Sequence, residues 1–384
     1  MRWDSLRLDA APDQAASDTG QQAGPVAGAG GPAPRTARAG GTPALFERDA
    51  IARTFDTPGF RGMTFYEVHA RSIINQVPAA SRVPFRWTIN PYRGCSHGCV
   101  YCFARNTHTY LDLDAGHDFD SKIVVKVNAP QLVRKELAAR KWQGEHVAMG
   151  TNVDCYQRAE GRYRLMPGIL QALLDARNPF SILTKGTMIL RDLDLLEQAA
   201  EVTDVGLSVS VGCADEELWR TLEPGTPSPQ RRLGVCAALT ARGLPCGVLM
   251  GPVVPFLSDS PAQLDATVRQ AAEAGASRLS PIVLHLRPGA REWFLAWLAE
   301  HHPALVPRYR ELYGRGAYAP KAYQRQIGEQ VRALAERHGL GRPGPGRRAW
   351  RSPPAPPPAA DGAARSRPGG DGPGDAGPVQ LSLL

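Results

Sequence analysis

Three of the seven cysteines lie within eight residues, at Cys95, Cys99 and Cys102, in the spacing C-x3-C-x2-C. Three thiolates from one short loop can converge on a single inorganic cluster, and Gly94 and Gly98 allow the tight backbone turns that such a loop needs. A structural zinc site normally closes with four ligands, whereas an iron-sulfur cluster held by three cysteines leaves one iron open to a further ligand. We therefore interpret this segment as a site for a cluster with one open iron.

Three other interpretations of these cysteines stay open at this point. A zinc site can be completed by His97 or by a distant cysteine. Cys99 and Cys102 can form a redox pair, because two residues separate them. Buried thiols with only a packing role are the third alternative.

The cysteine segment resembles the signature of the radical S-adenosylmethionine superfamily, C-x3-C-x-aromatic-C, with Tyr101 at the aromatic position. The resemblance implies a 4Fe–4S cluster on Cys95, Cys99 and Cys102, whose open iron is chelated by the amino and carboxyl groups of S-adenosylmethionine. Reduction of such a cluster cleaves the cofactor to methionine and a 5'-deoxyadenosyl radical. The wider wording N-P-Y-R-G-C-x-H-G-C-x-Y-C-F-A-R, at residues 90–105, is similar to the branch related to spore photoproduct lyase, a DNA-repair enzyme.

The composition is typical of a globular enzyme, with 384 residues of which 43% are hydrophobic and 7% aromatic. No apolar run is long enough to cross a bilayer and the first residues lack a signal-peptide core, so we expect a cytoplasmic protein. An odd number of cysteines, partly at ligand spacing, favours reduced thiols in a reducing compartment. The net charge of +8 favours a polyanionic partner, although arginine-rich tails contribute to it.

Five segments are expected along the chain. Residues 1–43 and 341–384 are rich in Ala, Gly and Pro and can bury little apolar surface, so we expect disordered tails. Residues 44–85 are expected to form an N-terminal extension packed on the core. The radical S-adenosylmethionine core is expected over residues 86–290, followed by a helical extension over residues 291–340.

Within the core, short apolar runs alternate with amphipathic segments, the pattern of strand–helix units around a parallel sheet. The expected strands cover residues 86–89, 147–149, 181–184, 205–209, 247–250 and 279–284. The expected helices, with apolar residues three and four apart, cover residues 165–177, 193–201, 229–242 and 261–274. Six such units fit the α/β fold that the resemblance implies, a partial (β/α)6 barrel related to the TIM barrel. In these barrels the chemistry takes place at the carboxyl ends of the strands.

Polar residues follow the second expected strand, beginning with Gly150, Thr151 and Asn152. By position, these three match the superfamily segment that hydrogen-bonds the amino group of S-adenosylmethionine, although the G-G-E wording of that segment is missing. The third expected strand ends at Lys185, which matches a lysine that pairs with the cofactor carboxylate in the repair-related branch. The alternative for the polar segment is a capped loop with solvated side chains.

The residues after Asn152 also match a pattern of the repair-related branch, T-D-x-Y-Q-x-x-E. The match predicts that Asp154, Tyr156, Gln157 and Glu160 line the substrate side. In spore photoproduct lyase a hydrogen-donating cysteine stands just before this segment, where the present chain has a glycine. Cys155 is the cysteine that can reach the same cavity, so we expect it to be the catalytic donor. This difference argues against reversal of thymine dimers as the reaction. It does not affect the expectation that the enzyme generates a 5'-deoxyadenosyl radical.

Three further cofactor contacts are predicted. Ser208 and Ser210 share one face of the fourth strand, and one of them is expected to bond the ribose or carboxylate of the cofactor, the alternative being a core serine bonded to backbone. Tyr101 stands between two ligand cysteines and is expected to contact adenine. The apolar residues 282–284 are expected to form a wall for the same ring.

These observations predict a radical S-adenosylmethionine enzyme that acts on nucleic acid in a repair-like reaction. Nothing in the chain resembles a second electron carrier, so we expect an external donor of the flavodoxin or ferredoxin type. The alternative function is a metal-stabilised adaptor that binds nucleic acid or a sliding clamp without turnover.

The last five residues, Gln380, Leu381, Ser382, Leu383 and Leu384, regain apolar content after a polar tail. They resemble the Q-L-x-L-F/L peptide that bacterial polymerases and repair proteins insert into the sliding clamp. Such a peptide places its glutamine in a polar subsite and its leucines in apolar pockets. The resemblance implies a clamp partner. A terminus without a function, or one that folds back on the domain, is the alternative.

Overall fold

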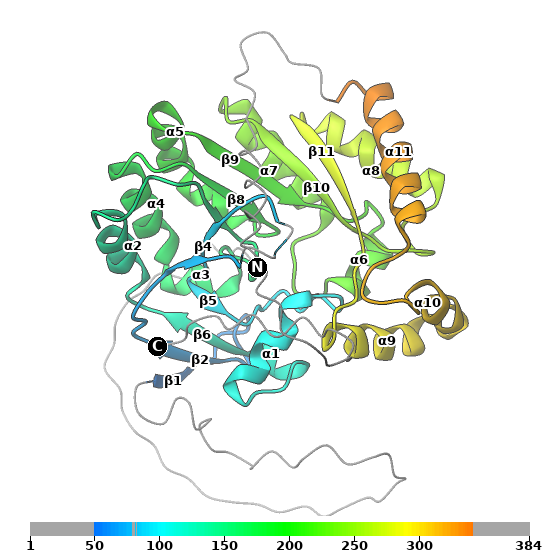
Figure 1. Cartoon of the computed structure of the whole chain (residues 1–384), viewed down its shortest axis with the longest axis horizontal. Helices are drawn as coiled ribbons and strands as arrows, with labels where there is room; N and C mark the ends of the chain where they lie inside the picture. Colours follow the sequence, from blue (N-terminus) through cyan, green and yellow to red (C-terminus); the bar gives the residue numbers. More distant parts are fainter. Residues whose placement is uncertain (1–49, 79–80, 82, 341–384) are drawn as a thin grey trace, which may run out of the picture.

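The computed structural model describes residues 50–78, 81 and 83–340, which form two sheets with helices around them (Figure 1). The larger sheet has the strand order β11-β10-β9-β8-β7-β4-β3. Its strands are β3 (Ile74–Gln76), β4 (Trp87–Ile89), β7 (Val147–Met149), β8 (Phe180–Thr184), β9 (Val205–Ser210), β10 (Cys246–Val253) and β11 (Arg278–Val283). All neighbouring pairs are parallel except β3 with β4, so the six strands expected from the sequence form one parallel sheet.

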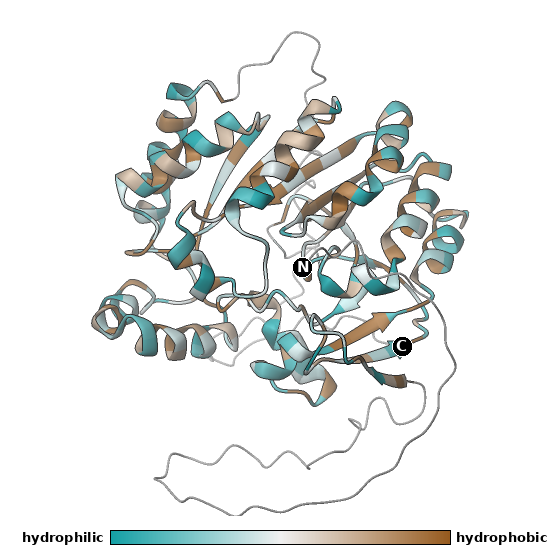
Figure 2. Ribbon diagram, turned by 180° about the vertical axis from the view of Figure 1, so that it is seen from behind, coloured by the Kyte–Doolittle hydropathy of each residue, from teal (hydrophilic) through white to brown (hydrophobic). Residues whose placement is uncertain are grey.

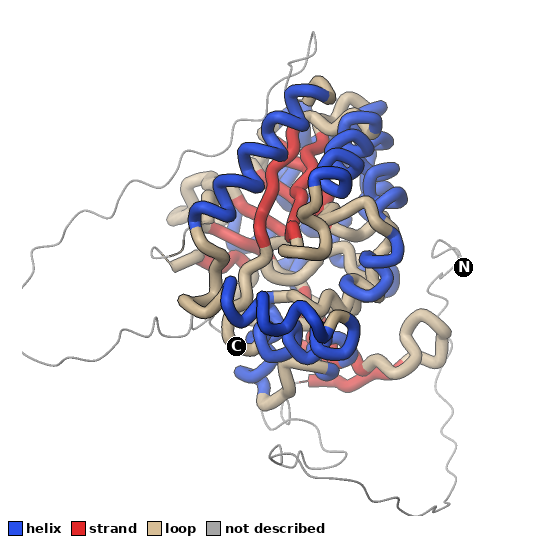
Figure 3. The backbone as a smooth tube through the Cα atoms, turned by 90° about the vertical axis from the view of Figure 1, so that its right-hand side faces the viewer, coloured by secondary structure: helices blue, strands red, loops and turns tan. Residues whose placement is uncertain are grey.

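The crossover helices flank this sheet, as the side view in Figure 3 shows. They are α4 (Leu165–Asp175), α5 (Leu193–Val202), α7 (Pro229–Ala241) and α8 (Pro261–Glu273). Each begins at its predicted residue and ends within two residues of the predicted end. The hydroxyls of Ser228 and Ser260 accept the backbone N–H groups of Arg231 and Gln263, and a proline follows each serine, so two of these starts are well capped. The expected α/β partial barrel is confirmed.

A second sheet was not predicted from the sequence. Its order is β1-β2-β6-β5, with β1 (Ala50–Thr54), β2 (Thr64–Val68), β5 (Tyr92–Arg93) and β6 (Lys122–Lys126). β2 pairs in parallel with β6, which lies far away in the sequence, and β5 pairs antiparallel with β6. Because β5 directly precedes the cysteine segment, this sheet fixes where that segment begins.

The C-terminal helices of the described chain are α9 (Ala290–His301), the short η5 (Pro303–Leu305), α10 (Val306–Leu312) and α11 (Lys321–Arg337). α11 packs its buried Ile327 and Val331 with Leu264 and Val268 of α8. α9 and α10 belong to another apolar cluster that includes Val100, from between the cysteines. Figure 2 shows mainly hydrophobic strands and helices of mixed colour, as expected for helices with one buried face.

The remaining helices lie in the connections between successive strands. They are η3 (Phe103–Leu111), α1 (His117–Ser121), α2 (Ala129–Leu137), α3 (Arg158–Tyr163), η4 (Met188–Asp192) and α6 (Glu216–Leu222). No helix among the described residues is long and apolar enough to span a membrane. The expected tails at residues 1–43 and 341–384, including the peptide Gln380 to Leu384, lie outside the described residues, and the expected segment boundaries stay predictions.

Candidate active site

A pocket of about 900 Å³, counted with its open mouth, lies at the carboxyl ends of the parallel strands. The cysteine loop, the loop after β7 and the ends of β8, β9 and β10 contribute its walls. Nine predicted site residues line it, namely Cys95, Cys99, Tyr101, Cys102, Gly150, Thr151, Asn152, Lys185 and Ser210.

The backbone of the cysteine loop is held by the side chain of Gln157. The Gln157 Oε1 atom accepts the backbone N–H of Ser96 at 2.9 Å, and its Nε2 atom donates to the carbonyl of Gly94 at 2.9 Å. Gln157 is fully buried, so water does not compete for these bonds. Gly94 and Gly98 have φ angles of 79° and 61°, which confirms the tight turns expected there. Gln157 therefore fixes the backbone of the loop that carries the three thiols.

The three thiols of this loop lie in a poorly hydrated environment. Burial raises the pKa of Cys99 to about 12 and that of Cys95 well above its usual range. The charges of neighbouring thiolates raise both pKa values further. A bound cationic cluster offsets these costs, because metal coordination deprotonates a thiol and neutralises its charge.

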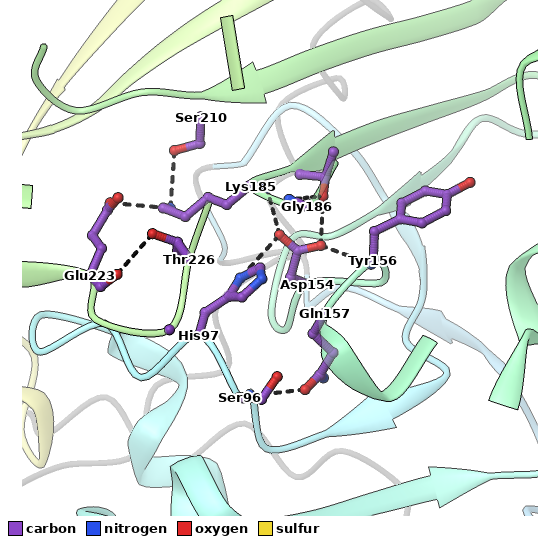
Figure 4. Close-up of polar contacts among 12 residues, drawn as sticks. Ser96, His97, Asp154, Tyr156, Gln157, Lys185, Gly186, Ser210, Glu223 and Thr226 are labelled. Carbon is purple, nitrogen blue, oxygen red and sulfur yellow. Dashed lines mark hydrogen bonds and ion pairs between the residues drawn. The ribbon is translucent and has the colours of Figure 1, made fainter. Parts of the chain in front are cut away.

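Asp154 is the polar centre of the pocket floor (Figure 4). Its carboxylate accepts the hydroxyl of Thr184 at 2.7 Å and the backbone N–H groups of Tyr156 and Lys185 at 2.8 and 2.6 Å. It also lies 3.5 Å from Nδ1 of His97, and burial lowers the pKa of that imidazole to about 4. Asp154 thus ties the loop after β7 to the end of β8 and to the cysteine loop.

Lys185 projects from the end of β8 across the pocket (Figure 4). Its Nζ atom donates to the Ser210 hydroxyl at 3.0 Å and lies 4.0 Å from Glu223 and 5.8 Å from the ring centroid of Tyr101. Burial alone lowers the pKa of Lys185, but the negative charges of Glu223 and Cys99 outweigh burial and raise it above its ordinary value. Lys185 is therefore a buried ammonium group at neutral pH, available to a carboxylate ligand.

Glu223 and Arg232 belong to no motif that marks a site in the sequence, yet Glu223 lies beside Lys185 and pairs with Arg232. Arg232 donates to the Glu223 carboxylate at 2.5 Å and to the Ser210 carbonyl at 2.7 Å, and the Tyr101 hydroxyl also donates to Glu223. Burial opposes ionisation of Glu223, but Arg232 and Lys185 hold its pKa below the usual value. Two cations therefore share one carboxylate, and of the two it is Lys185 that lines the pocket.

Gly150 starts the loop after β7 because that loop passes very close to β8. A Cβ atom at Gly150 would lie 1.8 Å from the carbonyl oxygen of Leu183, and the φ angle there is 74°. Thr151 and Asn152 then follow in the pocket wall. At Gly150 this segment can contact a ligand only through its backbone groups.

Two predicted residues are not among the pocket-lining residues. Ser208 lies on the same face of β9 as Ser210 but deeper in the barrel, where its hydroxyl accepts a hydrogen bond from Arg278 at 3.0 Å. Cys155 is fully buried in the main apolar core, and burial raises the pKa of its thiol well above the usual range. The donor role of Cys155 stays a prediction, and this burial keeps the thiol from direct contact with a pocket ligand.

The substrate-facing role expected for Tyr156, Gln157 and Glu160 is wrong. Tyr156 donates to Asp192 at 2.9 Å, and the fully buried Glu160 accepts the Tyr92 hydroxyl at 2.5 Å and Arg191 at 2.6 Å. These side chains satisfy one another beneath the pocket, as buried polar groups must. Of the four residues that match the T-D-x-Y-Q-x-x-E pattern, only Asp154 lines the cavity.

The apolar side of the pocket comes from β10 and β11 and their ends. Ile282 and Leu284 line it, as expected, whereas Val283 does not. Phe103 and His285 stand near them. An apolar wall on one side and the Lys185 ammonium on the other suit a ligand with a planar ring at one end and a carboxylate at the other.

The residues present fit an iron-sulfur cluster and S-adenosylmethionine. Three cysteine sulfurs from one loop are the donor set of such a cluster, and the Lys185 ammonium beside them suits a cofactor carboxylate. No three His, Cys, Asp or Glu side chains in the described residues are grouped so that they could hold a single metal ion.

Comparisons with known proteins agree with this geometry. The sequence model of the family described as "Radical SAM superfamily" matches residues 89–268. The uncharacterized protein Rv2578c of Mycobacterium tuberculosis is 50% identical over 301 residues, which is 78% of this chain and 88% of that protein. An uncharacterized protein of Methanocaldococcus jannaschii is 29% identical over 195 residues, covering 50% of this chain and 69% of that protein.

Solved structures with the same fold include spore photoproduct lyase complexed with dinucleoside spore photoproduct. Its TM-score is 0.56 at 15% identity, covering 72% of this chain and 80% of that one. A mutant of the lyase with bound AdoMet and the dinucleoside has a TM-score of 0.54 at 15% identity, covering 68% and 76% of the two chains. At this identity the likeness concerns the fold. Together with the family match and the cysteine loop, it places the chain in the radical S-adenosylmethionine superfamily, whose cofactors are a 4Fe–4S cluster and S-adenosylmethionine.

Proposed function

We propose that this enzyme binds a 4Fe–4S cluster on Cys95, Cys99 and Cys102, binds S-adenosylmethionine beside it, and acts on nucleic acid. The observation that carries the proposal is that the three thiols and the Lys185 ammonium line one pocket at the carboxyl ends of the strands. When bound and reduced, the cluster supplies the electron that cleaves the cofactor to methionine and a 5'-deoxyadenosyl radical. The protein itself binds and orients the cofactor and shields it from solvent.

The chain's own residues divide this work. Lys185 and the Ser210 hydroxyl hold the cofactor carboxylate, while Glu223 keeps Lys185 charged and aimed. Backbone groups at Thr151 and Asn152 receive the amino group. Tyr101 packs on the adenine side, its ring fixed by the hydrogen bond from its hydroxyl to Glu223.

Nucleic acid is the substrate class that the charge and the fold of this chain favour. The net charge of +8 suits a polyanion, and the lyase with the same fold is described with a dinucleoside product in its site. Gly150 stands at the place of the donor cysteine of that lyase, so we propose a different final hydrogen-transfer step here. The reaction class is abstraction of a hydrogen atom from a nucleotide.

Two protein partners belong to the same proposal. An external flavodoxin or ferredoxin delivers the electron, since the residues that line the pocket include no second redox group. A bacterial sliding clamp binds the peptide Gln380, Leu381, Ser382, Leu383 and Leu384, which lies outside the described residues. A clamp would raise the local concentration of the enzyme on DNA.

Anaerobic reconstitution tests the enzymatic half. We expect a brown protein with about four irons per chain that converts S-adenosylmethionine to 5'-deoxyadenosine with a chemical reductant. Cys99→Ala should lose both the iron and the conversion. One equivalent of zinc without iron, or iron without cofactor cleavage, would support the adaptor alternative. Transfer of deuterium between 5'-labelled cofactor and an oligonucleotide then identifies the substrate.

A further inference from the structure

A stack of three rings leads from the edge of the pocket to the molecular surface. Phe103 directly follows the last cysteine, His285 follows β11, and Tyr318 lies between α10 and α11. The Phe103 and His285 ring centroids are 5.7 Å apart, and His285 stacks on Tyr318 at 5.5 Å with an interplanar angle of 26°. Phe103 and His285 line the pocket, whereas Tyr318 lies beyond them. We call these three residues the aromatic shelf.

The shelf is held by backbone contacts rather than by loose side chains. His285 and Tyr318 face each other in an antiparallel bridge, and the N–H of Leu286 donates to the carbonyl of Ala317 at 2.7 Å. The buried Tyr313 donates to the carbonyl of Leu284 at 2.7 Å, which fixes the segment on the pocket side. A ligand therefore meets rings that are already ordered, which lowers the entropic cost of binding.

The rings are exposed although they are hydrophobic. Tyr318 keeps 55% of its surface accessible, Phe103 keeps 36%, and Ile282 at the same mouth keeps 43%. Large exposed side chains that gather at the mouth of a pocket are a recognised mark of a binding surface.

One arginine lies beside the shelf. The Arg287 guanidinium carbon lies 5.6 Å from the Phe103 ring centroid, and its Nη2 atom donates to the Tyr318 hydroxyl at 3.2 Å. Burial and Arg287 lower the pKa of His285, so its ring stays neutral and stacks as an uncharged aromatic.

We propose that the aromatic shelf and Arg287 bind the nucleotide next to the reacting one, in a single-stranded or unpaired stretch of nucleic acid. The neighbouring base stacks on the shelf while Arg287 contacts its phosphate, so that the reacting nucleotide enters the pocket. An aromatic face with a guanidinium beside it matches a base and its phosphate, because stacking accepts any base and the guanidinium neutralises a phosphate. This inference rests on the proposed nucleic-acid substrate and specifies how that substrate is held.

The test compares binding of two fluorescein-labelled probes by the reconstituted holoenzyme in fluorescence anisotropy. One probe is a short single-stranded oligothymidylate, and the other is a strand of equal length and charge made of abasic residues. We expect Tyr318→Leu to weaken binding of the oligothymidylate about ten-fold and to leave binding of the abasic strand unchanged. Tyr318→Phe keeps the ring and should bind both probes like the wild type. Arg287→Gln should weaken binding of both probes. It should also reduce the slope of log K against log salt concentration by the amount expected for about one phosphate contact.

Tyr110→Leu is the matched control, because Tyr110 is an exposed tyrosine that is not among the residues lining the pocket. The shelf proposal is overturned if Tyr318→Leu binds the oligothymidylate like the wild type or if it loses both probes equally. Failure of the proposed function gives a separate signal, which is the absence of 5'-deoxyadenosine from the wild-type enzyme. Anisotropy of the wild-type protein still reports nucleic-acid binding in that case.

Discussion

At the scale of single residues, Lys185 is the side chain best placed to recognise the cofactor. We predict that Lys185→Ala weakens S-adenosylmethionine binding about ten- to a hundred-fold, because a charge-assisted contact contributes roughly 1.5–3 kcal/mol. Isothermal titration calorimetry measures this affinity. Iron content should not change, since Lys185 is not a thiolate ligand.

The two serines of β9 provide a matched pair for this experiment. Ser210→Ala removes the partner of Nζ and should weaken cofactor binding by a few-fold, whereas Ser208→Ala should have no effect because that hydroxyl pairs with Arg278. Equal affinities in Lys185→Ala and the wild type would place the cofactor carboxylate elsewhere.

Glu223 stabilises the fold through its ion pair with Arg232, although it belongs to no sequence motif. We predict that Glu223→Gln lowers the free energy of unfolding by about 3–5 kcal/mol, because the fully buried Arg232 loses its charged partner. Urea denaturation of the apoprotein measures the change. Glu216→Gln, which removes the partner of the exposed Arg220, should change stability by less than about 1 kcal/mol. Similar small changes in both variants would contradict the prediction.

Lys185 and Ser210 were predictable because each lies at the carboxyl end of a strand in a known pattern. Glu223 and Arg232 were not, because they come from the segment around α6 and α7 and carry no spacing that marks a site. Ser208 was overpredicted. The two-residue period of a strand tells which face a residue lies on but not how deep it lies in the barrel.

At the scale of elements, the cysteine loop depends on one amide side chain from the loop after β7. Gln157→Leu leaves the Ser96 N–H and the Gly94 carbonyl without their partner, at a cost of about 1–3 kcal/mol for each buried group. We predict that this variant is less stable in urea and loses iron faster to a chelator.

Gln171→Leu is the control for that prediction, since the Gln171 amide bonds only to Asp175 on an exposed face of α4. This substitution should change stability by no more than about 0.5 kcal/mol. If Gln157→Leu retains iron as long as the control does, the cysteine loop is held by other contacts.

The six parallel strands and their helices could be predicted because each is a local pattern, an apolar run followed by a capped amphipathic segment. The second sheet could not, because β2 and β6 are short and each pairs with a distant segment. Register between such strands depends on tertiary packing, here of Phe65 and Ile123 in the main core. Tyr156 and Glu160 were misassigned for a similar reason, since burial beneath the pocket leaves no mark in a polar sequence.

At the scale of the whole molecule, the two sheets and the C-terminal helices converge on the cysteine loop. β5 of the small sheet leads into it, Gln157 of the barrel supports it, and α9 and α10 pack around Val100 in its middle. Under the proposed function, nucleic acid enters past His285 and Tyr318, where the segment after β11 meets the segment before α11. A partner that carries the enzyme to nucleic acid must then leave this side of the domain free.

The peptide Gln380, Leu381, Ser382, Leu383 and Leu384 meets this requirement if it binds a sliding clamp, because a long polar segment separates it from α11. We predict that a labelled peptide of about the last ten residues binds the cognate clamp with micromolar affinity in fluorescence anisotropy. Gln380→Ala combined with Leu383→Ala should abolish binding, since it removes the polar anchor and one apolar contact. A peptide of the same composition in scrambled order is the control. No clamp binding by the intact peptide or by the full chain would remove the clamp from the proposal and leave Arg287 and the aromatic shelf as its remaining link to nucleic acid.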